Sequence, residues 1–131
     1  MSALTVFDIA GRAMSAQLVR LNTVASNLAN AGSAAGSEAG AYRALKPVFA
    51  TEYSGSLATV DVERIANGSA PERRHDPTHP LADAAGDVWV ARVDTNQELI
   101  EMTETARQYA NNVEVMATAK SLILDTLRMG K

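Results

Sequence analysis

Apolar side chains spaced alternately three and four residues apart fill the last third of the chain and limit what it can fold into. Nine positions keep this spacing over four heptads, and eight are apolar or aromatic: Leu99, Met102, Ala106, Tyr109, Val113, Met116, Lys120, Ile123 and Leu127. On an α-helix they form one narrow stripe, typical of helices that pack against other helices. Thr95 and Glu98 match a capping box. Arg128 and Gly130 match a helix end, so the pattern predicts a helix over 95–131.

Lys120 is the one charge on this stripe. Such a residue either restricts the register and the number of partner helices, or extends its ammonium group into solvent. The second interpretation is favoured.

The first 31 residues carry a second stripe. Four large apolar residues lie seven apart, and smaller or similar residues follow four positions later: Phe7, Met14, Leu21 and Leu28, then Gly11, Leu18 and Ala25. Asp8 and Arg12 have the spacing of an i,i+4 ion pair. Five further apolar residues lie off the two stripes: Leu4, Val6, Val19, Leu122 and Leu124. More than one face of each helix is therefore expected to be covered by a partner.

The middle of the chain, residues 32–94, has a different composition. The segment "AGSAAGSEAGA" predicts a flexible loop, and "YRALKPVFATEY", "SLATVDVERIA" and "GDVWVARVD" predict two or three short strands. Turn residues fill the stretch between the last two. We therefore expect a mainly α structural unit with a small β excursion, in which helices over 1–31 and 95–131 pack as a coiled coil.

Composition excludes several classes of protein. The chain has 131 residues and no cysteine, which excludes disulfides, thiolate metal sites and cysteine nucleophiles. The net charge is −3 and neither half of the chain is basic, so a nucleic-acid partner is not expected. No signal peptide and no membrane span are expected either, because charges interrupt the N-terminal apolar run early.

Two histidines lie among carboxylates in the turn-rich segment. His75, His79, Asp76 and Asp83 are possible metal ligands, but Pro77 and Pro80 oppose the helix that would bring the two imidazoles to one face. We expect His79 and Asp76 to bond to nearby backbone instead. No carboxylate pair or phosphate-binding loop supports catalysis, so neither an enzyme nor a cofactor is predicted.

Short motifs stand out in three places. The first is "SNLANA" at the end of the N-terminal helix, followed by Tyr42-Arg43. The others are "DPTHPLADAAGDV", from Asp76, and "YANNVEVMATAKSLILDTLRMG", from Tyr109. Together they resemble the motifs of the bacterial flagellar basal-body rod protein family, along nearly the whole chain. The motif residues are Ser26, Asn27, Asn30, Asp76, Pro77, His79 and Pro80.

The resemblance implies a structural subunit of the flagellar rod, exported through the flagellar type III apparatus without a cleavable signal peptide. It implies a helical tube that crosses the periplasm as drive shaft and export channel. Expected partners are copies of the chain, other rod subunits, adaptor and ring proteins at the rod base, and the export apparatus. The expected assembly interface comprises Phe7, Met14, Leu18, Leu21, Leu28, Leu99, Met102, Tyr109, Val113, Met116, Ile123 and Leu127.

Asparagines are unusual beside an apolar helical stripe. A helix end explains Asn30, whereas Asn27 lies one turn earlier. The resemblance implies that these amides bond to neighbouring helices or subunits.

Two other classes remain open at this point. An adaptor or signalling coiled coil would share the terminal repeats and would form a stable soluble dimer. An enzyme would use His75 and His79, and metal analysis with a His79→Ala variant would test it.

Overall fold

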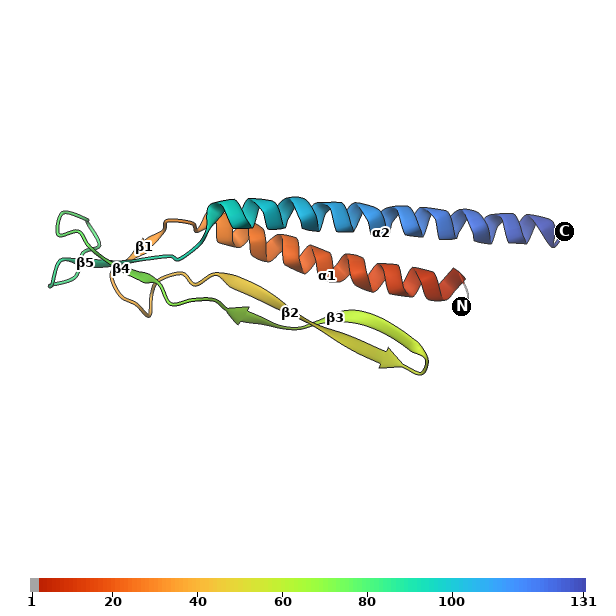
Figure 1. Cartoon of the computed structure of the whole chain (residues 1–131), viewed down its shortest axis with the longest axis horizontal. Helices are drawn as coiled ribbons and strands as arrows, with labels where there is room; N and C mark the ends of the chain where they lie inside the picture. Colours follow the sequence, from red (N-terminus) through yellow and green to blue (C-terminus); the bar gives the residue numbers. More distant parts are fainter. Residues whose placement is uncertain (1–2) are drawn as a thin grey trace.

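The computed structural model describes residues 3–131. Along the sequence, two long helices flank five strands, in the order α1, β1 to β5, α2 (Figure 1). The elements are α1 Ala3–Ala29, β1 Ala34–Ala35, β2 Leu45–Ser54, β3 Leu57–Asn67, β4 Glu72–His75, β5 Asp87–Val90 and α2 Thr95–Met129. The prediction of a mainly α chain with a small β excursion is confirmed.

The start of α2 differs in detail from the prediction. The helix begins at Thr95, but the carboxylate of Asp94 accepts hydrogen bonds from the backbone N of Asn96 (3.0 Å) and Gln97 (3.1 Å). The predicted capping box is therefore wrong. The residue before Thr95, in extended conformation, supplies the acceptor that the first amides of the helix need.

The strands β2 and β3 form a long antiparallel hairpin. Gly55 has a φ of +64°, and Ser56 completes a two-residue connection of the type II′ kind, in which the first central residue has positive φ. A register shift between Val48 and Phe49 marks a β-bulge. The sequence predicts both strands, although not their length of 10 and 11 residues.

The remaining strands form a three-stranded antiparallel sheet in the order β1-β5-β4. Its central strand β5 buries Val88 and Val90. The two edge strands are absent from the sequence prediction. Ala34 and Ala35, expected in a flexible loop, pair with Val90 and Trp89, so the flexible-loop prediction is wrong for this part of the segment.

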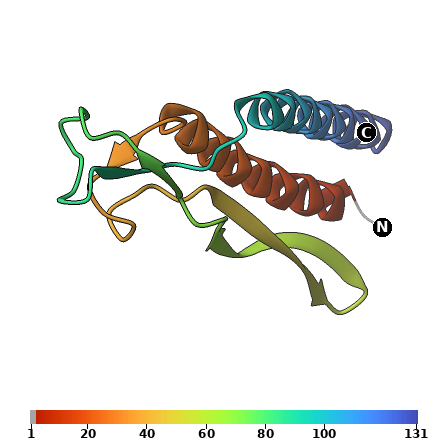
Figure 2. The same ribbon diagram turned by 60° about the vertical axis from the view of Figure 1, so that its left-hand side comes forward.

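The two helices and the hairpin lie side by side as three layers, with α1 in the middle (Figures 1 and 2). The helices are antiparallel, and α2 extends beyond the start of α1 (Figure 1). The predicted Asp8–Arg12 pair is present at 3.7 Å, and Arg12 also binds Glu52 of β2 at 2.7 Å. None of the helices in residues 3–131 is long and apolar enough to cross a membrane.

Candidate assembly surface and its internal joint

The face of α2 that packs on α1 consists of medium-sized, small and polar side chains. Thr105 is fully buried, and its hydroxyl donates to the carbonyl oxygen of Glu101 at 2.7 Å. Eight buried or half-buried positions alternate by four and three residues: Glu98, Met102, Thr105, Tyr109, Asn112, Met116, Ala119 and Ile123. The contact face thus keeps the heptad spacing but shares only every second position with the predicted stripe.

The other members of the predicted α2 stripe are exposed: Leu99, Ala106, Val113, Lys120 and Leu127. On α1, Leu18 is exposed, while Phe7, Met14, Leu21 and Leu28 are half-buried. The predicted stripes therefore do not close on each other within the chain. Close approach of two helix backbones requires small side chains at the contact, which places Thr105 and Ala119 inside and leaves Val113 outside.

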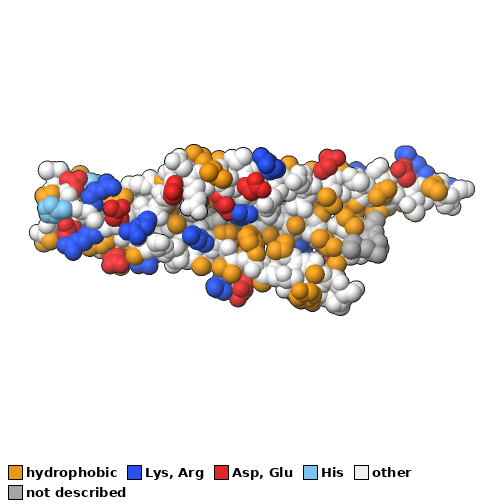
Figure 3. Space-filling model, in the orientation of Figure 1, with side chains coloured by type: hydrophobic (Ala, Val, Ile, Leu, Met, Phe, Trp, Pro, Cys, Tyr) orange, Lys and Arg blue, Asp and Glu red, His pale blue; other side chains and the backbone are white. Residues whose placement is uncertain are grey.

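Large apolar side chains lie along two outward stripes of α2. The first contains Leu99, Val113 and Leu124, each 44% exposed, and the second contains Val115, Leu122 and Met129, seven residues apart. A polar strip separates them and is formed by Thr103, Arg107, Glu114, Ser121 and Asp125. Figure 3 shows hydrophobic side chains along the helices and the hairpin, and charged ones gathered over the end that carries β4 and β5.

The second stripe borders a groove of about 570 Å³ between α2 and the start of α1. Val6, Val115 and Leu122 line it, and the buried Ala119 lies at its base. The groove is open to solvent along the helix pair, so the outward apolar surface is continuous across both helices at this end of the molecule.

Asn27 joins α1 to the hairpin. Leu45 lies opposite Asn67, and Gly68 N donates to the carbonyl oxygen of Ala44 at 2.6 Å, which turns the N–H and C=O of Leu45 away from β3. Asn27 bonds both groups: Leu45 N donates to Oδ1 at 2.7 Å, and Nδ2 donates to Leu45 O at 3.0 Å. The buried side-chain amide therefore replaces the peptide group of a third strand.

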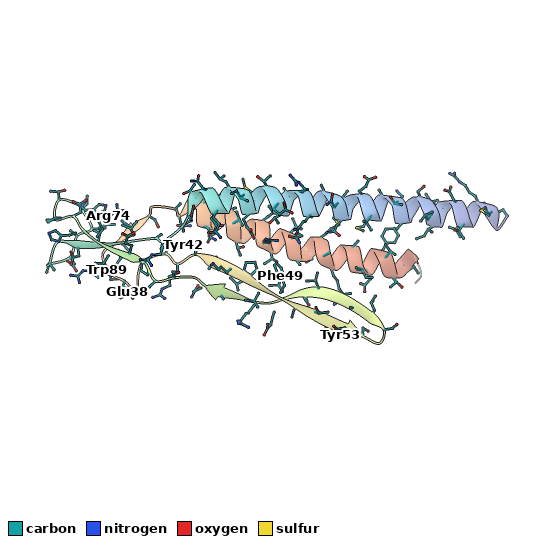
Figure 4. All side chains as sticks on the ribbon, viewed as in Figure 1. Glu38, Tyr42, Phe49, Tyr53, Arg74 and Trp89 are labelled. Carbon is teal, nitrogen blue, oxygen red and sulfur yellow. The ribbon has the colours of Figure 1, made fainter. Side chains whose placement is uncertain are left out.

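The neighbouring motif residues complete this joint. The Tyr42 hydroxyl donates to Asn27 Oδ1 at 2.8 Å and lies 2.9 Å from the Ser26 hydroxyl. Tyr42 lies near the end of α1, where the chain approaches β2 (Figure 4). Asn30 Nδ2 donates to Ser26 O at 2.9 Å, as expected for a helix end. The expectation that Asn27 bonds a neighbouring helix or subunit is wrong, because its polar atoms are occupied within the chain.

Asp87 is the buried charge of the β4–β5 pair. Its carboxylate, 6% exposed, bonds His75 Nδ1 at 2.8 Å and accepts from the Arg73 guanidinium, with Nε at 2.7 Å. The bond from His75, and then that from Arg73, lowers the pKa of Asp87 below its ordinary value. The triad spans neighbouring strands and closes the base of the loop between them.

That loop is held by short-range bonds of the kind predicted for Asp76 and His79. The backbone N of Thr78 donates to Asp76 Oδ1 at 3.2 Å, and the backbone N of Leu81 donates to His79 Nδ1 at 3.1 Å. The bond from the Thr78 hydroxyl lowers the pKa of Asp76. Gly86 closes the loop with a φ of +80°, where an added Cβ would lie 3.0 Å from Pro77 Cγ.

The two histidines point to different local partners rather than to one site. Within residues 3–131, no group of three or more histidine, aspartate or glutamate side chains could hold a metal ion. The hydrogen bonds of the two histidines therefore hold this end of the molecule together.

Known proteins similar to this chain agree with the motifs. The family profile described as "Flagella basal body rod protein" matches residues 7–32, and that described as "Flagellar basal body rod FlgEFG protein C-terminal" matches residues 86–129. The flagellar basal-body rod protein FlgC of Salmonella typhimurium (strain LT2) is 42% identical over 134 residues, with 100% of both chains covered. The chain belongs to the FlgC family of flagellar basal-body rod proteins.

Other FlgC relatives are similar over the same extent. The FlgC protein of Yersinia enterocolitica is 45% identical over 134 residues with 100% coverage of both chains. That of Aquifex aeolicus (strain VF5) is 31% identical, with 100% of this chain and 99% of the relative covered. The chain is thus a structural subunit of the flagellar basal-body rod and not an enzyme, and it assembles with other rod and basal-body components.

Membership of the FlgC family sets aside the adaptor coiled coil and the histidine enzyme. The structure also contains buried polar residues that the sequence did not predict. Asp87 and Thr105 are buried polar groups with structural partners, yet nothing in their local sequence distinguishes them from exposed residues. Tyr42 stood out only as part of a motif, and its contact with Ser26 and Asn27 depends on the chain returning from the β1 segment.

Proposed function

We propose that this FlgC-family chain enters the rod through its paired helices, which form a helical layer of a tube. Neighbouring subunits cover the outward stripes of α2 and the exposed parts of the predicted assembly interface. The tube crosses the periplasm as drive shaft and export channel. The chain reaches it through the flagellar type III apparatus, and it contacts its own copies, other rod subunits, and adaptor and ring proteins.

The observation that supports this proposal is the size of the buried side chains. Among residues 4–131, the buried apolar residues other than Pro71 and Gly86 are alanines and valines: Ala10, Ala16, Val24, Ala44, Val88, Val90, Ala91 and Ala119. Every leucine, isoleucine, methionine and phenylalanine in this range is half-buried or exposed. Burying one such side chain fully stabilises by about 1.5–3 kcal/mol. The six side chains of the outward stripes are 44–86% exposed, so covering them would contribute roughly 5–10 kcal/mol, comparable with a typical domain's margin of about 5–15 kcal/mol.

Folding is then coupled to assembly. A helix pair that fully buries only small and polar residues of α2, and leaves its large apolar residues partly exposed, gains little from burial, and isolated helices are marginal in water. Subunits that pack against the outward stripes supply the missing apolar contacts. The helices of the exported chain therefore become fully ordered at the growing end of the rod.

Substitution of Val113 by Asp tests the proposal in a motile host. The Val113→Asp chain should be expressed and exported at the normal level but absent from purified basal bodies, and the cells should not swim. A charge at this exposed position would be desolvated only by a neighbouring subunit. Leu21→Asp should have the same effect on assembly.

Ser121→Asp is the matched control, because it adds the same charge to the polar strip of α2. It should leave swimming and basal-body content near the wild-type level. Normal swimming of cells carrying both Val113→Asp and Leu21→Asp would overturn the proposal.

A further inference from the structure

A cluster of long polar side chains lies within the contact between α1 and α2. Arg20 Nε donates to Glu101 Oε1 at 2.6 Å, and a second guanidinium nitrogen donates to the same oxygen. One turn along, Gln17 Nε2 donates to Gln108 Oε1 at 2.8 Å. We call these four residues the interhelical polar cluster.

The Arg20–Glu101 pair differs from the other ion pairs of the chain. Among residues 3–131 it is the one ion pair that joins α1 to α2, whereas Asp8–Arg12, Glu104–Arg107 and Asp125–Arg128 lie within a helix. The Arg20 side chain is 21% exposed, so its charge is partly removed from water. A partly buried charge requires its partner more strongly than an exposed one does.

The rest of the contact face discriminates poorly between alternative pairings. Ala10, Thr105 and Ala119 allow close approach, but small side chains on a heptad repeat fit almost equally well after a shift of one heptad. A polar layer excludes the shifted registers by leaving its charges unpaired.

The interhelical polar cluster also contains a group that lowers the stability of the helix pair. Gln17 Oε1 is buried without a hydrogen-bond donor. An apolar side chain at this position would avoid that unsatisfied group. Gln17 therefore fits a role in specifying how the helices pair better than a role in stabilising their contact alone.

We propose that Gln17, Arg20, Glu101 and Gln108 determine the specificity of helix pairing by fixing its register: they hold α1 against the α2 of its own chain in one antiparallel register. This proposal rests on the proposed function, since a pair in a shifted register would present its outward stripes to neighbouring subunits out of place. Arg20 and Glu101 act as the charged pair, and the glutamines extend the polar layer by one turn. A shift of one heptad along either helix would separate the charges.

Charge reversal in cis and in trans tests the proposal in a motile host whose own copy is deleted. Arg20→Glu faces Glu101 with a like charge, and Glu101→Arg faces Arg20 in the same way. Each single variant should lower the amount of chain in purified basal bodies by about tenfold. The double variant in one chain restores opposite charges and should recover assembly to within about twofold of wild type.

Co-expression of the two single variants distinguishes pairing within a chain from pairing between chains. Each chain of the mixture still opposes like charges on its own helices, so the mixture should remain defective. Recovery in the mixture would overturn the proposal, because it requires Arg20 to bind Glu101 of another copy. Normal assembly of the single variants, or failure of the double variant, would overturn it as well.

Arg107→Glu is the control for charge reversal on α2. Arg107 lies on the polar strip, 3.9 Å from Glu104 of the same helix, and its reversal should leave assembly near wild type. Immunoblots of whole cells establish equal expression. If Val113→Asp abolishes assembly while charge reversal at Arg20 and Glu101 has no effect, the proposed function stands and the specificity role is excluded.

Discussion

At the scale of single residues, the side-chain amide of Asn27 does what no other residue of its size can do. It presents a donor and an acceptor at the spacing of a peptide group, and both groups of Leu45 are satisfied by it. A serine offers one group and an aspartate offers acceptors only. The Asn27 amide therefore holds the start of the hairpin against the end of α1.

Replacing Asn27 with alanine should lower the free energy of unfolding by about 2–4 kcal/mol, because the N–H and C=O of Leu45 lose their partner in a buried place. Urea unfolding of the purified chain measures the change. Asn27→Asp should also destabilise, since a carboxylate oxygen would face the Leu45 carbonyl without loss of side-chain volume. Asn30→Ala, which removes one bond at the helix end, should cost about 0.5–1.5 kcal/mol. An equal effect at positions 27 and 30 would contradict the peptide-like role.

Asp87 should make the stability of the β4–β5 pair depend on pH in the acidic range. The pKa of Asp87 is lowered in the folded chain, so the folded state binds fewer protons than the unfolded state. Its stabilising contribution is complete above the unfolded pKa of about 3.9 and is lost as the pH falls through the lower folded value.

Thermal unfolding followed by circular dichroism from about pH 6 down to about pH 2.5 measures this dependence. Asp87→Asn should lower the melting temperature most at the upper end of the range and flatten the profile below about pH 4. Asp76→Asn is the comparison, because Asp76 is exposed to a greater extent and its pKa is lowered chiefly by Thr78. An Asp87→Asn profile parallel to that of wild type would contradict the assignment.

At the scale of elements, the two helices end and begin where local chemistry requires. α2 starts after the acceptor of Asp94, and Glu98 in its first turn and Arg128 in its last turn agree with the helix dipole. The hairpin turns at Gly55, whose positive φ suits a two-residue connection. Local sequence therefore accounts for the two ends of α2 and for the tip of the hairpin.

Asp94→Ala should destabilise the first turn of α2 by about 1 kcal/mol, because the amides of Asn96 and Gln97 lose their acceptor. Hydrogen exchange of these two amides should accelerate. Thr95→Ala is the matched control and should have little effect, since Thr95 lies inside the helix. A larger effect at Thr95 would restore the predicted capping box.

At the scale of the whole molecule, α1 is covered on two sides and α2 on one. The hairpin and α2 both pack against α1 (Figures 1 and 2). The two outward stripes of α2 therefore remain exposed within the described chain. The Val113→Asp experiment belongs to this scale, because Val113 is exposed in the chain and, in our proposal, is covered by a neighbouring subunit. The interhelical polar cluster belongs to it as well, since its proposed role is to hold the helix pair in one register.

The sequence by itself determined the two terminal helices, the hairpin strands, the family and the local bonds of Asp76 and His79. These features depend on periodicity, turn residues and short-range hydrogen bonds, which neighbouring residues specify. The motif around Asn27 was visible, but its partner Leu45 lies 18 residues away. Only the tertiary structure, in which the chain returns to the end of α1, shows that the Asn27 side chain joins two elements of the same subunit.

The tertiary structure alone decided which face of α2 meets α1. Met102, Tyr109, Met116 and Ile123 belong to two possible stripes, one completed by Leu99, Ala106 and Val113, the other by Thr105, Asn112 and Ala119. Hydrophobicity favours the first and close packing the second. The structure contains the second, because Gln17 and Arg20 offer polar partners and small side chains let the backbones approach. The more apolar stripe therefore remains exposed at Leu99 and Val113.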